Sequence, residues 1–342
     1  MAKAPDNQIN DEEYYQISPE ILGSFPKYRP PVDLFRFDEK IAVLAPFSRK
    51  GARLTNEQVE QLAQLCADGN IFVSRSDHHI YSRHIVFQLD LVLQDANLKE
   101  AEIADICIRA LVMRYEEFYA QPVKAMLEKL HSDVLVVTEY LAQDKHRIQA
   151  FTRRLFRKAT PARHALNCFS LGLWLWLEDV GEWRRKELDS MAMAFILHDI
   201  GMSKMPAFIL SKAGPLKPDE KEKILQHPLL GAKLIQTFDL KTEDMVRAAF
   251  EHQERLDGSG YPQKIKGDAF SRTGRITALV DSFSAMIMDR TYAKGKEPVQ
   301  AAAELAKDPR YDSALAKTLM TPFATGKWAL VDMDKSLETA TA

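Results

Sequence analysis

MAMAFILHDIG, at residues 191–201, decides the fold of this chain. Residues 191–197 are apolar on every side of a helix, and such a pattern predicts a helix buried in a core. His198 and Asp199 end this run. An imidazole and a carboxylate are costly to bury unless they are paired or bind a metal ion. For one isolated pair, a core histidine bonded to a carbonyl is the ordinary alternative.

Three further polar residues interrupt apolar surroundings in the same half of the chain. His164 begins the apolar run 165–177, and Asp281 lies among small residues one helical turn to either side. His252 lies on a helical stripe whose other members are Met245, Ala249 and Leu256. Each of these polar residues alone has no explanation in an apolar setting, but together they indicate a metal-binding site.

His227 differs from these residues because Pro228 follows it and biases it out of helical geometry. We expect it at a junction between two helices, where a simple helix cap is the alternative. Six residues on four or five helices can then converge on one site, as in the metal sites of helical bundles. They are His164, His198, Asp199, His227, His252 and Asp281. Mixed imidazole and carboxylate ligands suit iron, manganese, nickel, cobalt or zinc better than magnesium or calcium.

The second half of the chain has a helical pattern throughout. Helices are predicted from Pro161 to at least Met288, with breaks at the Gly/Pro/Ser clusters 212–218 and 258–262. The run 165–177 is shorter than the roughly 20 residues that cross a bilayer, so it predicts a buried helix. Five other histidines lie in polar contexts and receive no role: His78, His79, His84, His131 and His146.

The first half of the chain has a different sequence pattern, with short strands as well as helices. Residues 1–40 are rich in proline and charge and predict an irregular arm, whereas residues 41–47 (IAVLAPF) and 71–74 (IFVS) predict short buried strands. Between them, Thr55 and Gln58 form a capping-box pattern, and Gly69 is placed to end the helix. Residues 99–158 show only long amphipathic helices.

The predicted fold class is therefore mainly α. We expect an arm and small α/β module at residues 1–98, with a sensory or dimerising role, and a helical connector at 99–158. An all-α domain follows at 159–325, with a tail at 326–342.

Composition excludes some classes of partner. The chain has 342 residues and is 46% apolar, which is enough to build real cores. Lysine and arginine total 46 against 48 aspartate and glutamate, so no charge excess favours DNA or membrane binding. The N-terminus has no apolar core typical of a secretory signal, so we expect a cytoplasmic protein. Cys66, Cys107 and Cys168 are far apart in apolar stretches and predict reduced core residues.

An ordered set of motifs in the second half resembles the HD-GYP family. The set begins with HDIG at 198–201 and LSK at 210–212, and continues with HP at 227–228 and HQER at 252–255. DGSGYP at 257–262 and RI at 275–276 complete it, ahead of Asp281 and Arg290. The resemblance covers about residues 150–320 and implies a helical, metal-dependent phosphodiesterase of cyclic di-GMP. Its product is the linear dinucleotide and, with further hydrolysis, GMP.

The resemblance also implies roles for the six residues. His164, His198, Asp199 and Asp281 would ligate one metal, and Asp199 would bridge to a second metal held by His227 and His252. Two such ions lower the pKa of a bridging water and aim the hydroxide at phosphorus, which makes His198 and Asp199 the catalytic pair. Iron or manganese is favoured, with nickel, cobalt and zinc as alternatives.

On the substrate side, the resemblance implies three contacts. Arg290 matches a position that contacts the substrate phosphate, and a guanidinium suits it because its donors form a planar fork. Tyr261 presents an amphipathic ring from the GYP loop. Lys204 is the nearest substitute for a family lysine that is Met202 in this chain.

The chain departs from the family pattern at further positions. Gln253 stands where the family has a second histidine, and its carbonyl is a weaker, neutral ligand for the second metal. Thr160 stands where trinuclear members have an acidic ligand, so we expect no third metal. Ser284 replaces a frequent second aspartate.

Three functions remain open at this point. The first is the cyclic di-GMP phosphodiesterase, and the second is a catalytically weak regulatory module that binds nucleotides or proteins. The third is an HD hydrolase of another nucleotide, such as a mixed cyclic dinucleotide. The expected partners are a cyclic dinucleotide substrate and either a second copy of the chain or a protein of the diguanylate-cyclase type.

Overall fold

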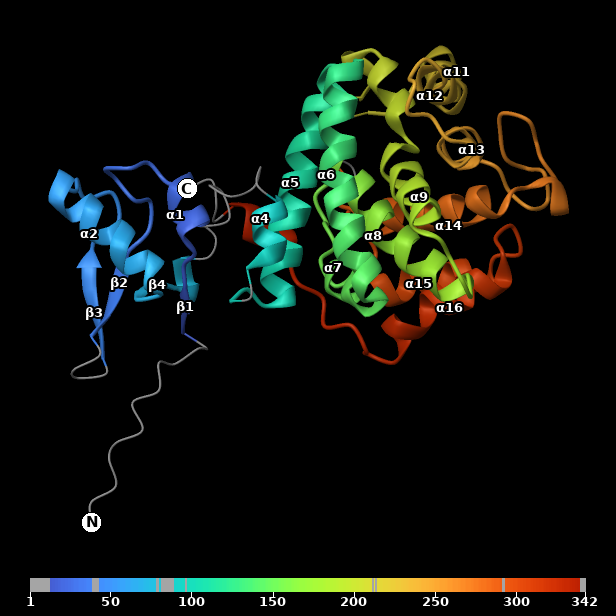
Figure 1. The fold of residues 1–342 in the computed structure, drawn as a ribbon. Coiled ribbons are helices and arrows are strands. Elements are labelled where there is room, and N and C mark those ends of the chain that lie inside the picture. The colour runs from blue at the N-terminus through green and yellow to red at the C-terminus, as the bar shows by residue number, and fades with distance from the viewer. Residues whose placement is uncertain are drawn as a thin grey trace. The chain divides into compact units, whose positions relative to one another are not determined.

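The computed structural model describes residues 13–38, 43–77, 80, 89–95, 97–210, 212, 214–290 and 293–338. Its internal contacts divide the chain into two units (Figure 1). The first unit comprises residues 1–110 and 336–342, and the second comprises residues 111–335. Among the described helices, none combines the length and apolar character needed to cross a membrane.

The first unit contains a four-stranded antiparallel sheet with the order β1-β4-β2-β3. The strands are β1 (Tyr14–Gln16), β2 (Leu34–Asp38), β3 (Val43–Ser48) and β4 (Ile71–Ser74). The unit also contains α1 (Pro19–Ser24), α2 (Asn56–Ala67), η1 (Arg75–Asp77) and α4 (Leu89–Gln94). β4 lies between two strands, and Ile71, Phe72 and Val73 are buried. The prediction of a small α/β module is confirmed.

The capping box is confirmed at the start of α2. The Thr55 hydroxyl accepts from the Gln58 amide at 3.2 Å, and the Gln58 side chain accepts from the Thr55 amide at 3.0 Å. Gly69 has a φ of 76°, a left-handed conformation that favours glycine and ends the helix.

Two predictions for this unit are wrong. Residues 13–38 are not an irregular arm, because β1, α1 and β2 lie within them. These elements are at most six residues long, so proline and charge dominated their pattern. The strand predicted at 41–47 is β3, which lies at the sheet edge and is not buried. Residues 41 and 42 lie outside the described part of the chain.

The second unit is helical. α5 (Glu100–Ala120) spans the boundary between the units, and α6 (Lys124–Gln143), η2 (Lys145–Arg147) and α7 (Ile148–Thr152) follow. The central elements are α8 (Pro161–Asp179), α9 (Arg185–Leu197), η3 (Ile200–Lys204), α10 (Ala207–Leu210), α11 (Pro218–Ile224), α12 (His227–Gln236) and α13 (Glu243–Glu251). η4 (Gly267–Ala269), α14 (Arg272–Ile287), α15 (Pro298–Lys307), α16 (Ser313–Ala324) and α17 (Met333–Glu338) complete the order.

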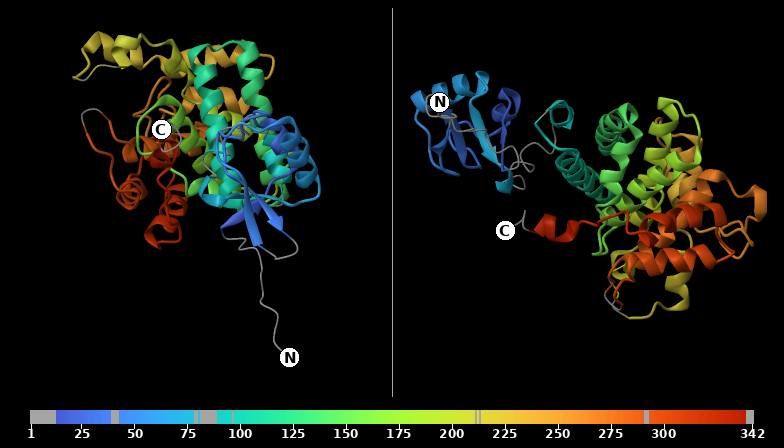
Figure 2. Two further views of the ribbon diagram at one scale, coloured as in Figure 1. Left: turned by 90° about the vertical axis from the view of Figure 1, so that its left-hand side faces the viewer. Right: turned by 90° about the horizontal axis from the view of Figure 1, so that it is seen from below.

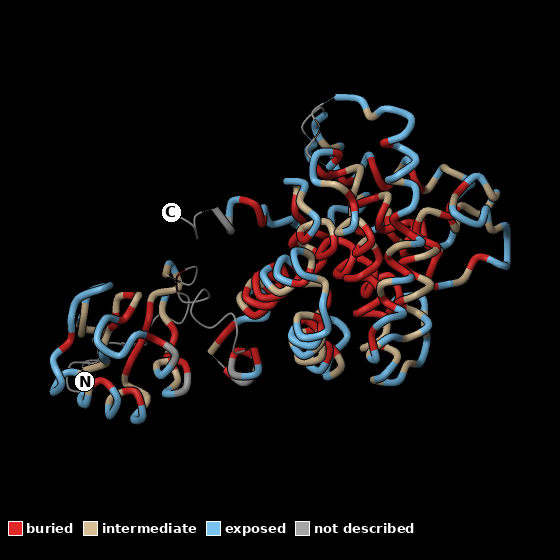
Figure 3. The backbone as a smooth tube through the Cα atoms, turned by 90° about the horizontal axis from the view of Figure 1, so that it is seen from above, coloured by how far each residue is buried: buried red, intermediate tan, exposed pale blue. Residues whose placement is uncertain are grey.

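The core of this unit forms around α8 and α9. Residues 165–177 and 191–197 are all buried, as their apolar patterns predict (Figure 3). α8 packs against α9 and α14, and α13 packs against α9, α12 and α14. α15 packs against α14 and α16, and these C-terminal helices can be followed in Figure 2. The two predicted breaks lie where the structure has loops, before α11 and at 258–262.

Candidate metal centre

Glycine lets the segment after α9 lie directly on α12. His198 caps α9, Asp199 follows, and η3 begins at Ile200. A Cβ on Gly201 would lie 2.0 Å from the His227 carbonyl oxygen and 2.7 Å from the Gly231 amide nitrogen. Only glycine permits this approach, so the HDIG glycine brings Asp199 and His227 together.

Two local predictions about the histidines are wrong in detail. His227 lies at the junction between α11 and α12, as predicted, but it is the first residue of α12. Pro228 is compatible with this because the first turn of a helix needs no N–H partner. His252 caps the C-terminus of α13, so Leu256 lies beyond the helix. Leu256 therefore does not belong to the helical stripe of Met245 and Ala249.

Three imidazoles are held in the same way. The Nδ1 atoms of His198, His227 and His252 each donate to the backbone carbonyl three residues earlier, at 2.8, 2.7 and 2.9 Å. A proton on Nδ1 leaves a lone pair on Nε2, and hydrogen bonds of this kind to a carbonyl fix the tautomer of metal-binding histidines. All three Nε2 atoms are thus prepared to accept a cation.

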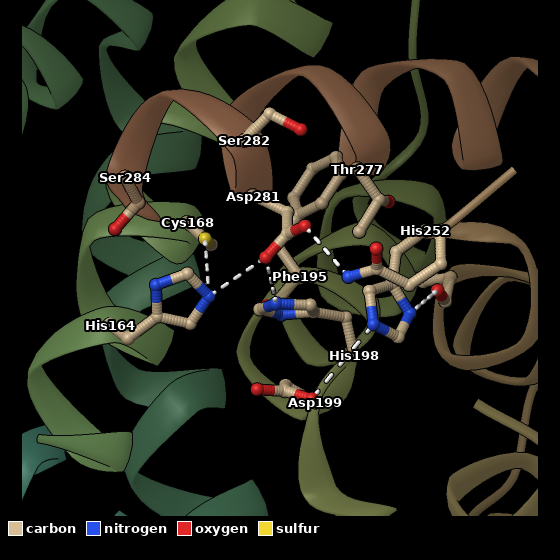
Figure 4. Close-up of polar contacts among 12 residues, drawn as sticks. His164, Cys168, Phe195, His198, Asp199, His252, Thr277, Asp281, Ser282 and Ser284 are labelled. Carbon is tan, nitrogen blue, oxygen red and sulfur yellow. Dashed lines mark hydrogen bonds and ion pairs between the residues drawn. The ribbon is translucent and has the colours of Figure 1, made fainter. Parts of the chain in front are cut away.

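The polar side chains form two neighbouring clusters, and Figure 4 labels all of their members except His227. In the Asp199 cluster (Asp199, His227 and His252), the two Nε2 atoms are 2.8 Å apart. They lie 3.4 and 3.9 Å from Asp199 Oδ1. The rings of His198 and His252 contact each other edge to face across the clusters, with centroids 5.2 Å apart.

The Asp281 cluster comprises Asp281, His164, Cys168 and His198. Asp281 Oδ1 lies 3.0 Å from His164 Nε2 and 3.7 Å from His198 Nε2. Cys168 Sγ lies 3.7 Å from His164 Nε2. The structure therefore brings together all six predicted ligands and adds a cysteine that sequence reasoning had placed in the core.

The buried atoms of these clusters fit metal ions. Two buried atoms, His198 Nε2 and Asp199 Oδ1, have no hydrogen-bond partner among the described residues. In the Asp199 cluster, two lone pairs face each other, since both Nδ1 atoms carry the proton. Buried polar atoms left unpaired are rare and costly. A cation in each cluster would satisfy them.

The electrostatics also favour positive charge at this place. Burial raises the pKa of the Asp281 carboxyl, but the hydrogen bond with His164 and the nearby His198 imidazole outweigh it and hold that pKa well below its usual range. Burial lowers the pKa of His164, but Cys168 and Asp281 outweigh it and raise that pKa to about 10. Burial and the adjacent His227 hold the pKa of His252 well below its usual value, so it is a neutral ligand.

Gln253 has a different contact from the one its position suggests. Its Nε2 donates to Asp281 Oδ2 at 3.1 Å. The amide thus turns its nitrogen toward the Asp281 cluster and orients the carboxylate. The expected weak carbonyl ligand to the second metal does not fit this contact.

A buried glutamate holds the GYP loop against the site. Glu254 is fully buried and accepts from the amides of Gln263, Lys264 and Ile265 at 2.6, 3.0 and 3.1 Å. A Cβ on Gly260 would lie 2.4 Å from the Glu254 Cα, so the loop passes directly over the end of α13. This brings the Tyr261 ring next to His227, with centroids 6.3 Å apart.

A cavity of about 780 Å³ opens over both clusters. Arg290 and Tyr261 line it, as do Met202 and Thr160. Thr160 also caps α8 by accepting from the Arg163 amide at 3.2 Å. Lys204, in contrast, is exposed and is not among the residues that line the cavity.

Two positively charged side chains in the cavity wall were not predicted from the sequence. Arg255 Nη2 donates to Ser282 at 3.2 Å, and Lys212 pairs with Glu220 at 2.5 Å. Both side chains line the cavity. Lys212 is the last residue of the LSK motif and Arg255 is the last residue of HQER, and this was the available signal, but neither residue type is unusual in a loop.

Comparisons with known proteins agree with this geometry. The profile described as HD domain matches residues 141–315. A cyclic di-GMP phosphodiesterase of Pseudomonas aeruginosa is 32% identical over 132 residues, which are 37% of this chain and 32% of that protein. A 3'3'-cGAMP-specific phosphodiesterase of Vibrio cholerae is 32% identical over 135 residues, 39% of this chain and 23% of that protein. The chain thus covers about a third or less of the length of these relatives.

One solved structure matches almost the whole chain. An HDG"Y"P protein from Bdellovibrio bacteriovorus aligns over 91% of this chain and 99% of its own, with a TM-score of 0.58. The two sequences are 14% identical, so the match shows a shared fold.

Proposed function

This chain belongs to the HD domain family, and we propose that its second unit is a metal-dependent phosphodiesterase that hydrolyses cyclic di-GMP to the linear dinucleotide. The observation that carries the proposal is the pair of clusters beneath one cavity, with Asp199 Oδ1 and His198 Nε2 buried and without a hydrogen-bond partner among the described residues. Side chains of this kind are arranged to bind cations, and the cavity is of a size typical of small-molecule sites.

The proposed cofactors are two transition-metal ions, with iron or manganese favoured. His164, His198 and Asp281 would hold one ion, and Asp199, His227 and His252 would hold the other. When bound, such ions supply Lewis acidity, which activates water and neutralises charge on a phosphate.

The protein's own groups would orient the substrate. Arg290 and Arg255 line the cavity, and a guanidinium binds a phosphate through two parallel donors. The Tyr261 ring offers an apolar face beside His227. Gln253 holds the Asp281 carboxylate toward the two histidines that contact it. Because Lys204 is exposed, Lys212 is the lysine better placed to reach a phosphate.

Turnover of cyclic di-GMP tests the proposal. Protein loaded with iron or manganese is incubated with cyclic di-GMP, and the linear product is measured by chromatography. A double variant with His198→Ala and Asp199→Ala should be inactive, whereas His146→Ala, an exposed histidine in η2, should match the wild type. Equal product from wild type and the double variant would overturn the proposal.

A mixed cyclic dinucleotide is the second candidate substrate. The observation that favours it is the similarity to a protein named as 3'3'-cGAMP-specific. The same assay with 3'3'-cGAMP in a parallel arm separates the two, since the higher kcat/KM identifies the preferred substrate. Metal content separates both enzymes from a binding module, which would fold with one metal or none.

A further inference from the structure

We propose that Cys168 is a thiolate ligand of the metal held by the Asp281 cluster. This inference rests on the proposed function for the presence of that metal, and it adds a sulfur to a site otherwise made of imidazole and carboxylate. The residue shares α8 with His164 and is fully buried.

Helical spacing places the thiol on the same face as a predicted ligand. Cys168 follows His164 by four residues, and side chains at that spacing lie one above the other. Two metal ligands at this spacing on one helix are the basis of the H-E-x-x-H zinc motif. Figure 4 shows the Cys168 sulfur directed at the His164 imidazole.

The distances match a shared ion. Ligand lengths of about 2.3 Å to sulfur and 2.05 Å to nitrogen place the two atoms roughly 3.6 Å apart in a tetrahedron. Cys168 Sγ and His164 Nε2 are 3.7 Å apart. Candidate ligand atoms of His164, Cys168 and His198 all lie within 4.8 Å of one another.

An independent observation points to a ligand at the same place. His198 is fully buried, its Nδ1 bonds the Phe195 carbonyl, and its Nε2 has no hydrogen-bond partner among the described residues. A buried imidazole nitrogen without a hydrogen-bond partner is costly, so a cation is expected beside His198 and within reach of Cys168. A cation between His164, Cys168, His198 and Asp281 satisfies all four groups.

Cys66 shows what a purely structural cysteine looks like in this chain. It is also buried, but its Sγ donates to the Ile17 carbonyl at 3.3 Å. Cys168 instead faces imidazoles and lies in the same cluster as a carboxylate. Both cysteines are buried, so it is the groups around each sulfur that distinguish a structural cysteine from a metal ligand.

A sulfur ligand changes which metal the cluster selects. Thiolates favour zinc and iron over manganese or magnesium, which prefer oxygen. The Asp281 cluster should therefore bind iron or zinc more tightly than manganese.

Cobalt substitution tests the inference without any assay of activity. The full chain is loaded with Co²⁺, and the near-ultraviolet spectrum is searched for a thiolate-to-cobalt charge-transfer band. The band should appear in the wild type and in Cys66→Ser, and it should be lost in Cys168→Ser. The affinity for one of the two ions should fall at least about tenfold in Cys168→Ser, since even outer-shell changes cost that much.

X-ray absorption of the zinc-loaded wild type gives a second readout that needs no variant. A sulfur scatterer at about 2.3 Å supports the inference. A shell of nitrogen and oxygen alone, or a cobalt band that persists in Cys168→Ser, overturns it. A protein that binds metal through sulfur but does not hydrolyse cyclic dinucleotides would refute the proposed function and leave this inference standing.

Discussion

Gly201→Ala should disable the Asp199 cluster without replacing any of its ligands. The added Cβ would lie 2.0 Å from the His227 carbonyl oxygen, 2.9 Å from the His227 carbonyl carbon and 2.7 Å from the Gly231 amide nitrogen. All three are backbone atoms, so no side-chain rotation relieves the overlap. η3 and the start of α12 must separate.

The size of the effect follows from the overlap. Ordinary contact begins at 3.4 Å, so the gap must open by 3.4 − 2.0, or about 1.4 Å. Overpacking of this kind costs about 1–3 kcal/mol, and the rigid backbone on both sides places Gly201→Ala near 3 kcal/mol. A shift of about 1 Å in a catalytic group costs roughly 100-fold in rate. We therefore expect at least that loss in turnover, with weaker metal binding at His227.

The assay uses the distribution of tryptophan in the chain. All four tryptophans, at 174, 176, 183 and 328, belong to the second unit, so their fluorescence in urea reports its unfolding. Gly181→Ala is the matched control because its Cβ would meet nothing within 4 Å. It should change stability by less than about 0.5 kcal/mol. If Gly201→Ala keeps the wild-type midpoint, metal content and turnover, the contact between η3 and α12 does not position the site.

Three further predictions concern other parts of the structure. Glu254→Gln replaces one of the oxygens that accept three loop amides, so the free energy of unfolding from fluorescence in urea should fall by about 1.5–3 kcal/mol; an unchanged free energy of unfolding would refute the role of Glu254. Thr55→Ala removes the cap of α2 and should speed amide exchange in that helix about 2- to 30-fold, measured by mass spectrometry, with tryptophan fluorescence unchanged. Chelation should lower the melting temperature of metal-loaded wild type, because ions at 100 times their Kd stabilise a fold by about 2.7 kcal/mol. The His198→Ala, Asp199→Ala variant should show a smaller shift, and an equal shift would place the ions elsewhere.

The helices of the second unit could be predicted because their signal is local. Residues 191–197 are apolar on every side, and such a segment is buried whatever it packs against. β1 and β2 could not be predicted in the same way. β1 has three residues and pairs with β4, about sixty positions away, so its stability comes from a partner that the local pattern does not contain.

The candidate site, too, could be predicted only where its signal is local. The six His and Asp residues were recognisable because each is polar in an apolar setting. The place of Cys168 beside His198 was missed since a cysteine in an apolar run is typical of a core, and only the packing of α8 against α9 brings these two side chains together. The contact of Gln253 with Asp281 could likewise not be predicted from the sequence, because it depends on a side-chain direction set by the end of α13.

A titration of turnover against bound metal tests whether hydrolysis depends on ions in both clusters. Metal-free protein is loaded stepwise with iron or manganese, and metal per chain and linear product from cyclic di-GMP are measured on the same sample. We predict that product appears only as both clusters fill, and that the His198→Ala, Asp199→Ala variant neither retains the metal nor forms product. Hydrolysis by fully metal-free protein, or saturation with two ions per chain and no product from either cyclic dinucleotide, would contradict it.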